Sequence, residues 1–134
     1  SKEIEEPVEM VDLMPTLMGL CGLETPASTA GKSLMPLINA KVKSWHKACF
    51  CEIDHSMSTK PELRRGKTGR RVMVRTRSWK LIFFMDKRVD NKDGALYNLE
   101  KDPYEKNNLY FDGDYASIIR RLENLAYEFD RHAK

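Results

Sequence analysis

The sequence has 134 residues, which is enough for one domain with a modest apolar core. Lys and Arg exceed Asp and Glu by 23 to 20, and this net charge of +3 gives no global argument for nucleic-acid binding. No apolar run approaches the length of a membrane span, so we expect no membrane contact. The start of the sequence is acidic and polar, and we expect no signal peptide in it.

The first predicted helix begins at Asp12, a residue type that favours the N-cap position. Pro15 falls in its first turn, where a missing backbone donor does little harm. Gly22 suits the position just past its end. The helix carries an apolar stripe formed by Leu13, Leu17 and Leu20. A short helix that is apolar on most sides is usually covered by other parts of a protein.

From residue 47 the apolar side chains follow a period of two, which predicts β-strands. Four strands are expected, over residues 47–53, 70–76, 79–85 and 95–99. The third strand is apolar on both faces apart from Lys80, and we therefore place it centrally in the sheet.

The last predicted element is a long helix capped by Asp114. Its apolar positions recur at helical spacing and form one continuous stripe, made of Tyr115, Ile118, Ile119, Leu122, Leu125, Ala126 and Phe129. The expected fold class is therefore α+β. It comprises a four-stranded antiparallel sheet with a C-terminal helix packed on one face, preceded by an N-terminal helical segment.

The cysteines and histidines give no sign of a metal site. Cys21, Cys49 and Cys51 make an odd number, so at least one is free or pairs with another chain. We expect all three to be small buried apolar side chains, since no second Cys or His pair completes a metal site. His46 and His132 are expected to be ordinary surface residues.

Three carboxylates lie close together in Glu100, Asp102 and Glu105. The 12-residue ligand spacing with a central Gly that marks a calcium loop is absent. We therefore expect a turn in which these carboxylates cap backbone groups.

Residues 60–80 hold nine Lys and Arg against a single acid, Glu62. Such a segment is either a solvated surface or a site for anions, which Arg and Lys bind through charge-assisted hydrogen bonds. Nucleic acid is not expected, because it would require interleaved aromatic residues or a groove-reading helix, and only Trp79 is near.

The segment 54–69 is longer than a hairpin requires, and loops of that length are usually functional or disordered. Its candidate substrate-binding residues are His55, Lys60, Arg64 and Arg65, whose side chains are donors suited to an anionic sugar. The alternative is a mobile, solvated loop.

Three segments, in the same order, resemble the sulfatases of the alkaline-phosphatase-like superfamily. Residues 11–37 resemble the run D-L-x-P-T-L-x-x-L-x-G followed by P and G-x-S-L-x-P-L. Residues 74–82 are similar to V-R-T-x-x-[YW]-K with a hydrophobic pair, and residues 96–109 resemble L-Y-N-L-x-x-D-P-x-E-x-x-N-L.

The resemblance implies that residues 1–46 belong to the end of the large sulfatase domain and residues 47–134 to its C-terminal subdomain. It implies a missing N-terminal domain as partner, with a calcium ion and a formylglycine residue in that parent. It also suggests a sulfated small molecule or sugar as substrate, a substrate pocket partly lined by the C-terminal subdomain, and an exported parent (periplasmic, extracellular or lysosomal).

No residue of this chain matches the family's catalytic or metal positions. None of the three cysteines stands in the C/S-x-P-x-R motif from which formylglycine forms. We therefore expect the chain alone to be inactive, and its apolar first helix to drive self-association. The alternative is a stand-alone small α+β module that binds an anionic partner through residues 60–80.

Overall fold

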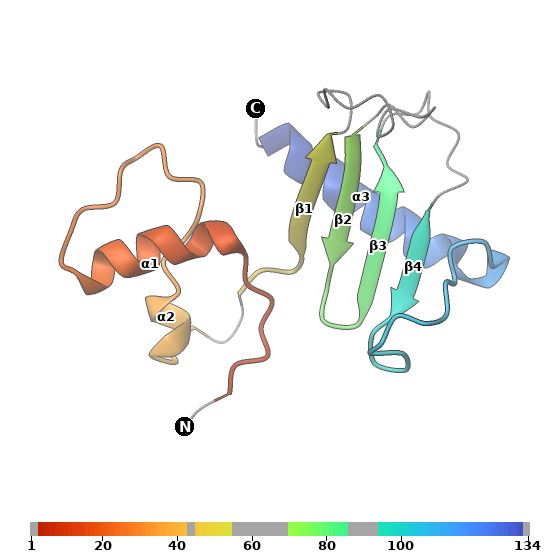
Figure 1. Ribbon diagram of the computed structural model, residues 1–134, viewed down its shortest axis with the longest axis horizontal. Coiled ribbons are helices and arrows are strands. Elements are labelled where there is room, and N and C mark those ends of the chain that lie inside the picture. The colour runs from red at the N-terminus through yellow and green to blue at the C-terminus, as the bar shows by residue number, and fades with distance from the viewer. Residues whose placement is uncertain (1–2, 43–44, 55–69, 86–93, 133–134) are drawn as a thin grey trace. The chain divides into compact units, whose positions relative to one another are not determined.

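The computed structural model describes residues 3–42, 45–54, 70–85 and 94–132 (Figure 1). The chain divides into two compact units, Ser1–Cys49 and Phe50–Lys134. No helix in these described ranges is long and apolar enough to cross a membrane.

The first unit contains three short helical elements. A 3-10 turn, η1 (Met10–Asp12), leads directly into α1 (Leu13–Leu20), and α2 spans Met35–Ile38. Gly22 has a φ of 70°, the left-handed conformation predicted for the residue that ends the helix. The apolar stripe of α1 is exposed, with Leu17 at 60% and Leu20 at 61%.

The start of α1 differs from the sequence prediction in one respect. Asp12 does occupy the N-cap position, but its backbone is already helical and its side chain makes no capping bond to α1. The reason is that η1 runs into α1 without a break, which leaves the Asp12 carboxylate to other partners.

The second unit is built on four strands in the order β1-β2-β3-β4 (Figure 1). Their bounds are Cys49–Asp54, Arg70–Arg75, Trp79–Phe84 and Ala95–Asn98. Neighbouring strands run in opposite directions, and Val74 pairs with Leu81, which pairs with Leu96. The α+β class, the antiparallel sheet and the inner position of β3 are thus confirmed.

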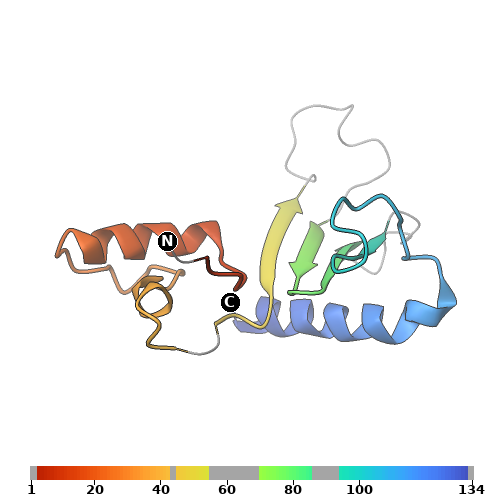
Figure 2. The same ribbon diagram turned by 90° about the horizontal axis from the view of Figure 1, so that it is seen from below.

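The helix α3 (Ala116–His132) lies along one face of the sheet (Figure 2). Leu122 and Ala126 of this helix are 0% and 1% exposed. The core of the second unit combines these two side chains with the buried Val72, Val74, Leu81, Phe83 and Leu96 of the inner strands and β4. This packing confirms the predicted stripe on the last helix.

The predicted cap of the last helix is wrong by two residues. A 3-10 turn, η4 (Gly113–Tyr115), precedes α3, and Asp112 caps it by accepting a 3.0 Å hydrogen bond from the backbone N–H of Asp114. Asp114 itself lies inside that turn. Two Asp residues two positions apart give the same sequence signal, and the extra 3-10 turn decides between them.

The prediction of three buried cysteines is also wrong. Cys49 is buried, but Cys21 and Cys51 are exposed, and all three are free thiols. Cys21 immediately follows α1, whose flank is open, and Cys51 lies on β1, a strand at the edge of the sheet. An edge strand offers less cover to its side chains than an inner one.

Candidate functional site

The four residues proposed to bind substrate, His55, Lys60, Arg64 and Arg65, lie outside the described residues. The structure does define both ends of their segment. Strand β1 ends at Asp54 and β2 begins at Arg70, and these two strands are neighbours in the sheet. The described residues on either side of the segment therefore lie on adjacent strands.

Several cations of the basic segment are engaged within the second unit. Arg70 Nη1 donates to Asp130 Oδ1 at 2.7 Å, and Lys80 Nζ lies 2.6 Å from Glu105 Oε2. The Arg71 guanidinium lies 4.7 Å from the centre of the Phe84 ring, a cation–π contact. The charge available to an external anion is thus smaller than the residue count over 60–80 suggests.

The sulfatase-like segment 96–109 forms a closely hydrogen-bonded turn after β4. The side-chain oxygen of Asn98 accepts bonds from the backbone N–H groups of Glu100 and Lys101, at 3.1 and 3.2 Å. The backbone carbonyl of Asn98 accepts from the N–H of Asp102 at 2.7 Å. The Asn of this motif therefore starts the turn.

Asn108 ties the end of the same turn back to the strand. Its Oδ1 accepts from the backbone N–H groups of Leu96 and Tyr110, both at 3.0 Å, and its Nδ2 donates to the carbonyl of Gly94 at 3.1 Å. At Gly94, a Cβ would lie 2.1 Å from the Tyr110 ring, so any larger residue there would require the ring to move. One amide side chain thus satisfies three backbone groups.

The three carboxylates of this turn all have structural partners. Asp102 Oδ2 accepts from the backbone N–H of Asn107 at 2.8 Å, Glu100 accepts from the Ser78 hydroxyl at 2.5 Å, and Glu105 pairs with Lys80. The Asn107 bond is the main cause that lowers the pKa of Asp102 below its usual 3.8. Among the residues that the structure describes, no group of three His, Cys, Asp or Glu side chains could hold a metal ion.

Asp12 is the most buried charged residue described, at 1% exposure. Its Oδ1 accepts from the backbone N–H of Lys32 at 2.8 Å, and its Oδ2 accepts from that of Glu9 at 3.2 Å. His46 Nε2 lies 3.4 Å from Oδ2, on a side chain only 21% exposed. His46 therefore lies beside the buried carboxylate without a hydrogen bond from Nε2, a contact that the expectation of a surface histidine missed. The His132 side chain lies outside the described part.

Thr16 completes this arrangement one turn into α1. Its hydroxyl donates to the carbonyl of Asp12 at 2.6 Å and accepts from the N–H of Leu34 at 2.8 Å. At Gly31, a Cβ would lie 2.0 Å from the carbonyl oxygen of Val11. The Asp, Thr and Gly of the first sulfatase-like segment therefore join α1 to the loop before α2.

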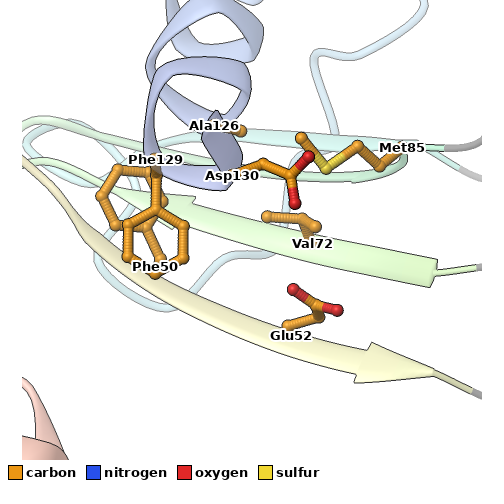
Figure 3. A pocket seen from close by; sticks show the side chains of 7 residues that line it. All are labelled: Phe50, Glu52, Val72, Met85, Ala126, Phe129 and Asp130. Atoms are coloured by element: carbon orange, nitrogen blue, oxygen red, sulfur yellow. The ribbon is translucent and has the colours of Figure 1, made fainter. Parts of the chain in front are cut away.

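A cavity of about 300 Å³ opens between β1, β2 and the C-terminal part of α3 (Figure 3). It is lined by Phe50, Glu52, Val72, Met85, Ala126, Phe129 and Asp130. Sequence reasoning did not find it, because its residues come from four places in the chain and follow no motif.

Comparison with known families decides how these structural motifs are interpreted. A family model described as N-sulphoglucosamine sulphohydrolase, C-terminal, matches residues 1–131. The chain belongs to this family. The sulfatase resemblance is thereby confirmed, and the chain is a sulfatase C-terminal domain.

Curated relatives are much longer than this chain. An N-acetylglucosamine-6-O-sulfatase of Bacteroides thetaiotaomicron is 28% identical over 132 residues, which cover 92% of this chain and 21% of the relative. Human arylsulfatase K is 27% identical over 80% of this chain and 19% of its own length. The chain thus spans about a fifth of the length of these two relatives.

Solved structures give the same result. A putative sulfatase from B. thetaiotaomicron superposes with a TM-score of 0.70 and 30% identity, over 90% of this chain and 24% of that one. A phosphonate monoester hydrolase of Agrobacterium radiobacter superposes with a TM-score of 0.69 and 24% identity, over 98% of this chain and 25% of that one. The second likeness concerns the fold alone.

Proposed function

We propose that this domain completes a sulfuric-ester hydrolase that acts on a sulfated sugar, and that it lines part of that enzyme's substrate pocket. The observation that carries the proposal is the family match over residues 1–131, combined with relatives about five times as long. One of these relatives is an N-acetylglucosamine-6-O-sulfatase, and a similar solved structure holds its substrate D-glucosamine-2-N,6-O-disulfate.

Catalysis in this proposal belongs to an N-terminal domain that carries the formylglycine and binds the calcium ion. The residues present here do not fit either group. Cys21, Cys49 and Cys51 lack the C/S-x-P-x-R context, and the described ranges contain no cluster of metal-ligand side chains. The 134-residue chain is therefore expected to be inactive alone. From the family resemblance, the parent enzyme is expected to be exported.

The exposed apolar stripe of α1 supports a covering partner for the first unit. Leu13, Leu17 and Leu20 are each more than 40% exposed on one helix of eight residues. In the proposed enzyme, residues 1–46 belong to the large domain, which covers this stripe. Without that cover, burial of the same surface between two copies drives self-association.

The proposed substrate contacts are His55, Lys60, Arg64 and Arg65, between β1 and β2. Their support is the cationic composition of the segment and the anionic sugar in the structure of a relative. Arg70 and Lys80 already have carboxylate partners within the domain, so the cations before β2 are the better candidates for the substrate.

The decisive experiment uses the full-length enzyme with Arg64 and Arg65 both replaced by Ala. We expect KM for a sulfated sugar to rise by about tenfold or more, while turnover of a small aryl sulfate stays nearly unchanged. The matched control replaces Arg120 and Arg121, two neighbouring exposed arginines on α3, and should change neither value. An equal response of both substrates, or no response, would contradict a role in substrate selection.

A second experiment tests the division of labour. The purified 134-residue chain is incubated with an activated aryl sulfate, with and without calcium, beside the full-length enzyme. We expect hydrolysis only from the full-length enzyme. Hydrolysis that co-purifies with the short chain would show that the catalytic groups lie within it.

A further inference from the structure

We propose that the cavity beneath the last turn of α3 binds a small ligand with an apolar body and a single cationic head. The cavity holds about 300 Å³, at the lower end of the volumes of ligand sites in proteins. That space suits one ring or a short branched chain. This proposal does not depend on the proposed sulfatase activity.

The apolar part of the cavity arises from small side chains facing each other across the helix–sheet interface. Val72 on β2 and Ala126 on α3 are 3% and 1% exposed, and neither fills the space between the two elements. The Phe50 and Phe129 rings stack at 4.4 Å with an angle of 11°, and they wall one end, opposite Met85 (Figure 3). An apolar ligand body gains burial against these groups.

The polar part has more negative than positive charge among its described side chains. Arg70 makes two bonds of 2.7 Å, from Nη1 to Asp130 and from Nη2 to the Met85 sulfur, whereas its Nε lies 3.4 Å from the Glu52 carboxylate. Glu52 is 43% exposed and therefore keeps acceptor capacity for a further donor. One guanidinium thus faces two carboxylates.

The helix adds to the same sign of charge. Phe129 and Asp130 lie in the last turn of α3, and the helix dipole gives this C-terminal end a partial negative charge. A cationic head placed beside Glu52 is favoured by this field. An anionic head would have to displace a carboxylate from Arg70.

The test uses protonated phenethylamine as the probe and the isotope-labelled 134-residue chain as the protein. Phenethyl alcohol and phenylacetate serve as neutral and anionic ligands of similar shape. We expect saturable amide shifts at Phe50, Glu52 and Phe129, with the amine binding about three- to fivefold tighter than the alcohol, as a half-exposed ion pair allows. Phenylacetate should bind most weakly.

Variants separate the two parts of the site. Glu52→Gln should remove the advantage of the amine over the alcohol and leave binding of the alcohol unchanged. Glu128→Gln, an exposed carboxylate on the same helix, is the matched control and should leave both affinities unchanged. Ala126→Leu should fill the cavity and abolish binding of both probes. If this variant does not fold, the affinities of the amine and the alcohol for the parent and for Glu52→Gln still test the proposal.

Three results would overturn the proposal. One is the absence of saturable shifts at the three amides. Another is phenylacetate binding as tightly as phenethylamine, which would mark Arg70 as the dominant charge. The third is a preference for the amine that survives Glu52→Gln, since the cationic head would then lie elsewhere.

Discussion

The two units of this chain hold their structures by different means. In the first unit, α1 is joined to the following loop by a buried carboxylate and a threonine hydroxyl, while its apolar stripe faces outward. In the second unit, α3 turns its apolar stripe onto the sheet, and the buried side chains between them are hydrocarbon. Helix α1 is therefore held by polar contacts, whereas α3 is held by apolar burial.

Polar side chains that bond backbone groups occur in both units, and they explain why the sulfatase motifs contain so many polar residues without catalytic groups. Asp12, Thr16, Asn98 and Asn108 each satisfy backbone groups that would otherwise lose their water partners. Few residue types can replace such a side chain, whereas a core leucine can be exchanged for other apolar residues. A motif can thus mark a family strongly and still be structural.

The largest effect is expected at Leu122, which is 0% exposed at the centre of the second unit. Leu122→Ala should lower the free energy of unfolding by about 2–5 kcal/mol, because it leaves a cavity between α3 and the sheet. The measurement is denaturant unfolding followed by circular dichroism. Arg121→Ala, on the exposed side of the same helix, should stay close to the parent. An unchanged midpoint for Leu122→Ala would show that α3 is not packed as described.

The next effect tests the polar arrangement of the first unit. Asp12→Ala removes the acceptor for two backbone N–H groups and should cost about 1–3 kcal/mol. The loss should be local, so we expect faster hydrogen exchange at the Lys32 amide and little change at the Leu122 amide. Glu24→Ala, at an exposed carboxylate of the same unit, is the control. Equal acceleration in both units would mean that they do not differ as proposed.

Sequence patterns predicted the second unit more completely than the first. The strand expected over 79–85 is observed at Trp79–Phe84, and the helical stripe through Leu122 and Ala126 is buried as expected. Apolar periodicity succeeds here because the elements bury their faces against each other within the same unit. Apolar periodicity does not indicate the 3-10 turn η4 that precedes α3, and for this reason the prediction placed the cap at Asp114 instead of Asp112.

The first unit shows what such patterns omit. The sequence placed Asp12 at the start of α1, but its partners Lys32 and His46 lie 20 and more positions away. Long-range polar contacts have no period, so a single sequence cannot reveal them. The cavity beside Ala126 was missed because its lining residues come from four separate places in the chain. The proposed substrate residues His55, Lys60, Arg64 and Arg65 stay predictions, because they lie outside the described ranges.

A smaller effect is expected for the ion pair between Lys80 and Glu105. A double-mutant cycle with Lys80→Met and Glu105→Gln should give a coupling of about 0.5–1 kcal/mol, near the upper end for pairs close to the surface. The half-buried side chains justify that end of the range, at 22% and 32% exposure. The coupling should fall with added salt. A value near zero at low salt would mean that the pair merely accompanies the turn.

The smallest expected effect concerns the pH dependence of the same turn. Hydrogen bonds from the Asn107, Lys106 and Tyr104 backbone, together with the Lys106 charge, lower the pKa of Asp102 below 3.8. Because the folded pKa is the lower one, this stabilisation is present above the unfolded value and is lost as the pH falls through the folded pKa. Carboxyl resonances recorded by NMR should show Asp102 titrating below pH 3.8. The protection of the Asn107 amide, relative to its intrinsic exchange rate, should fall over the same range.

The variant Asp102→Asn separates this local effect from general acid unfolding. The side-chain amide of the variant can still accept a bond from the Asn107 N–H, but it carries no titrating charge. The protection of the Asn107 N–H against hydrogen exchange should therefore no longer change with pH over this range. Glu24→Gln, in the first unit, should leave the titration at Asn107 unchanged. Suppose that acid instead lowers the protection of the Asn107 and Lys32 amides together in the parent and in both variants. Protonation of the whole domain would then have a larger effect on stability than the Asp102 turn. The difference between the two units would then hold for mutations and not for pH.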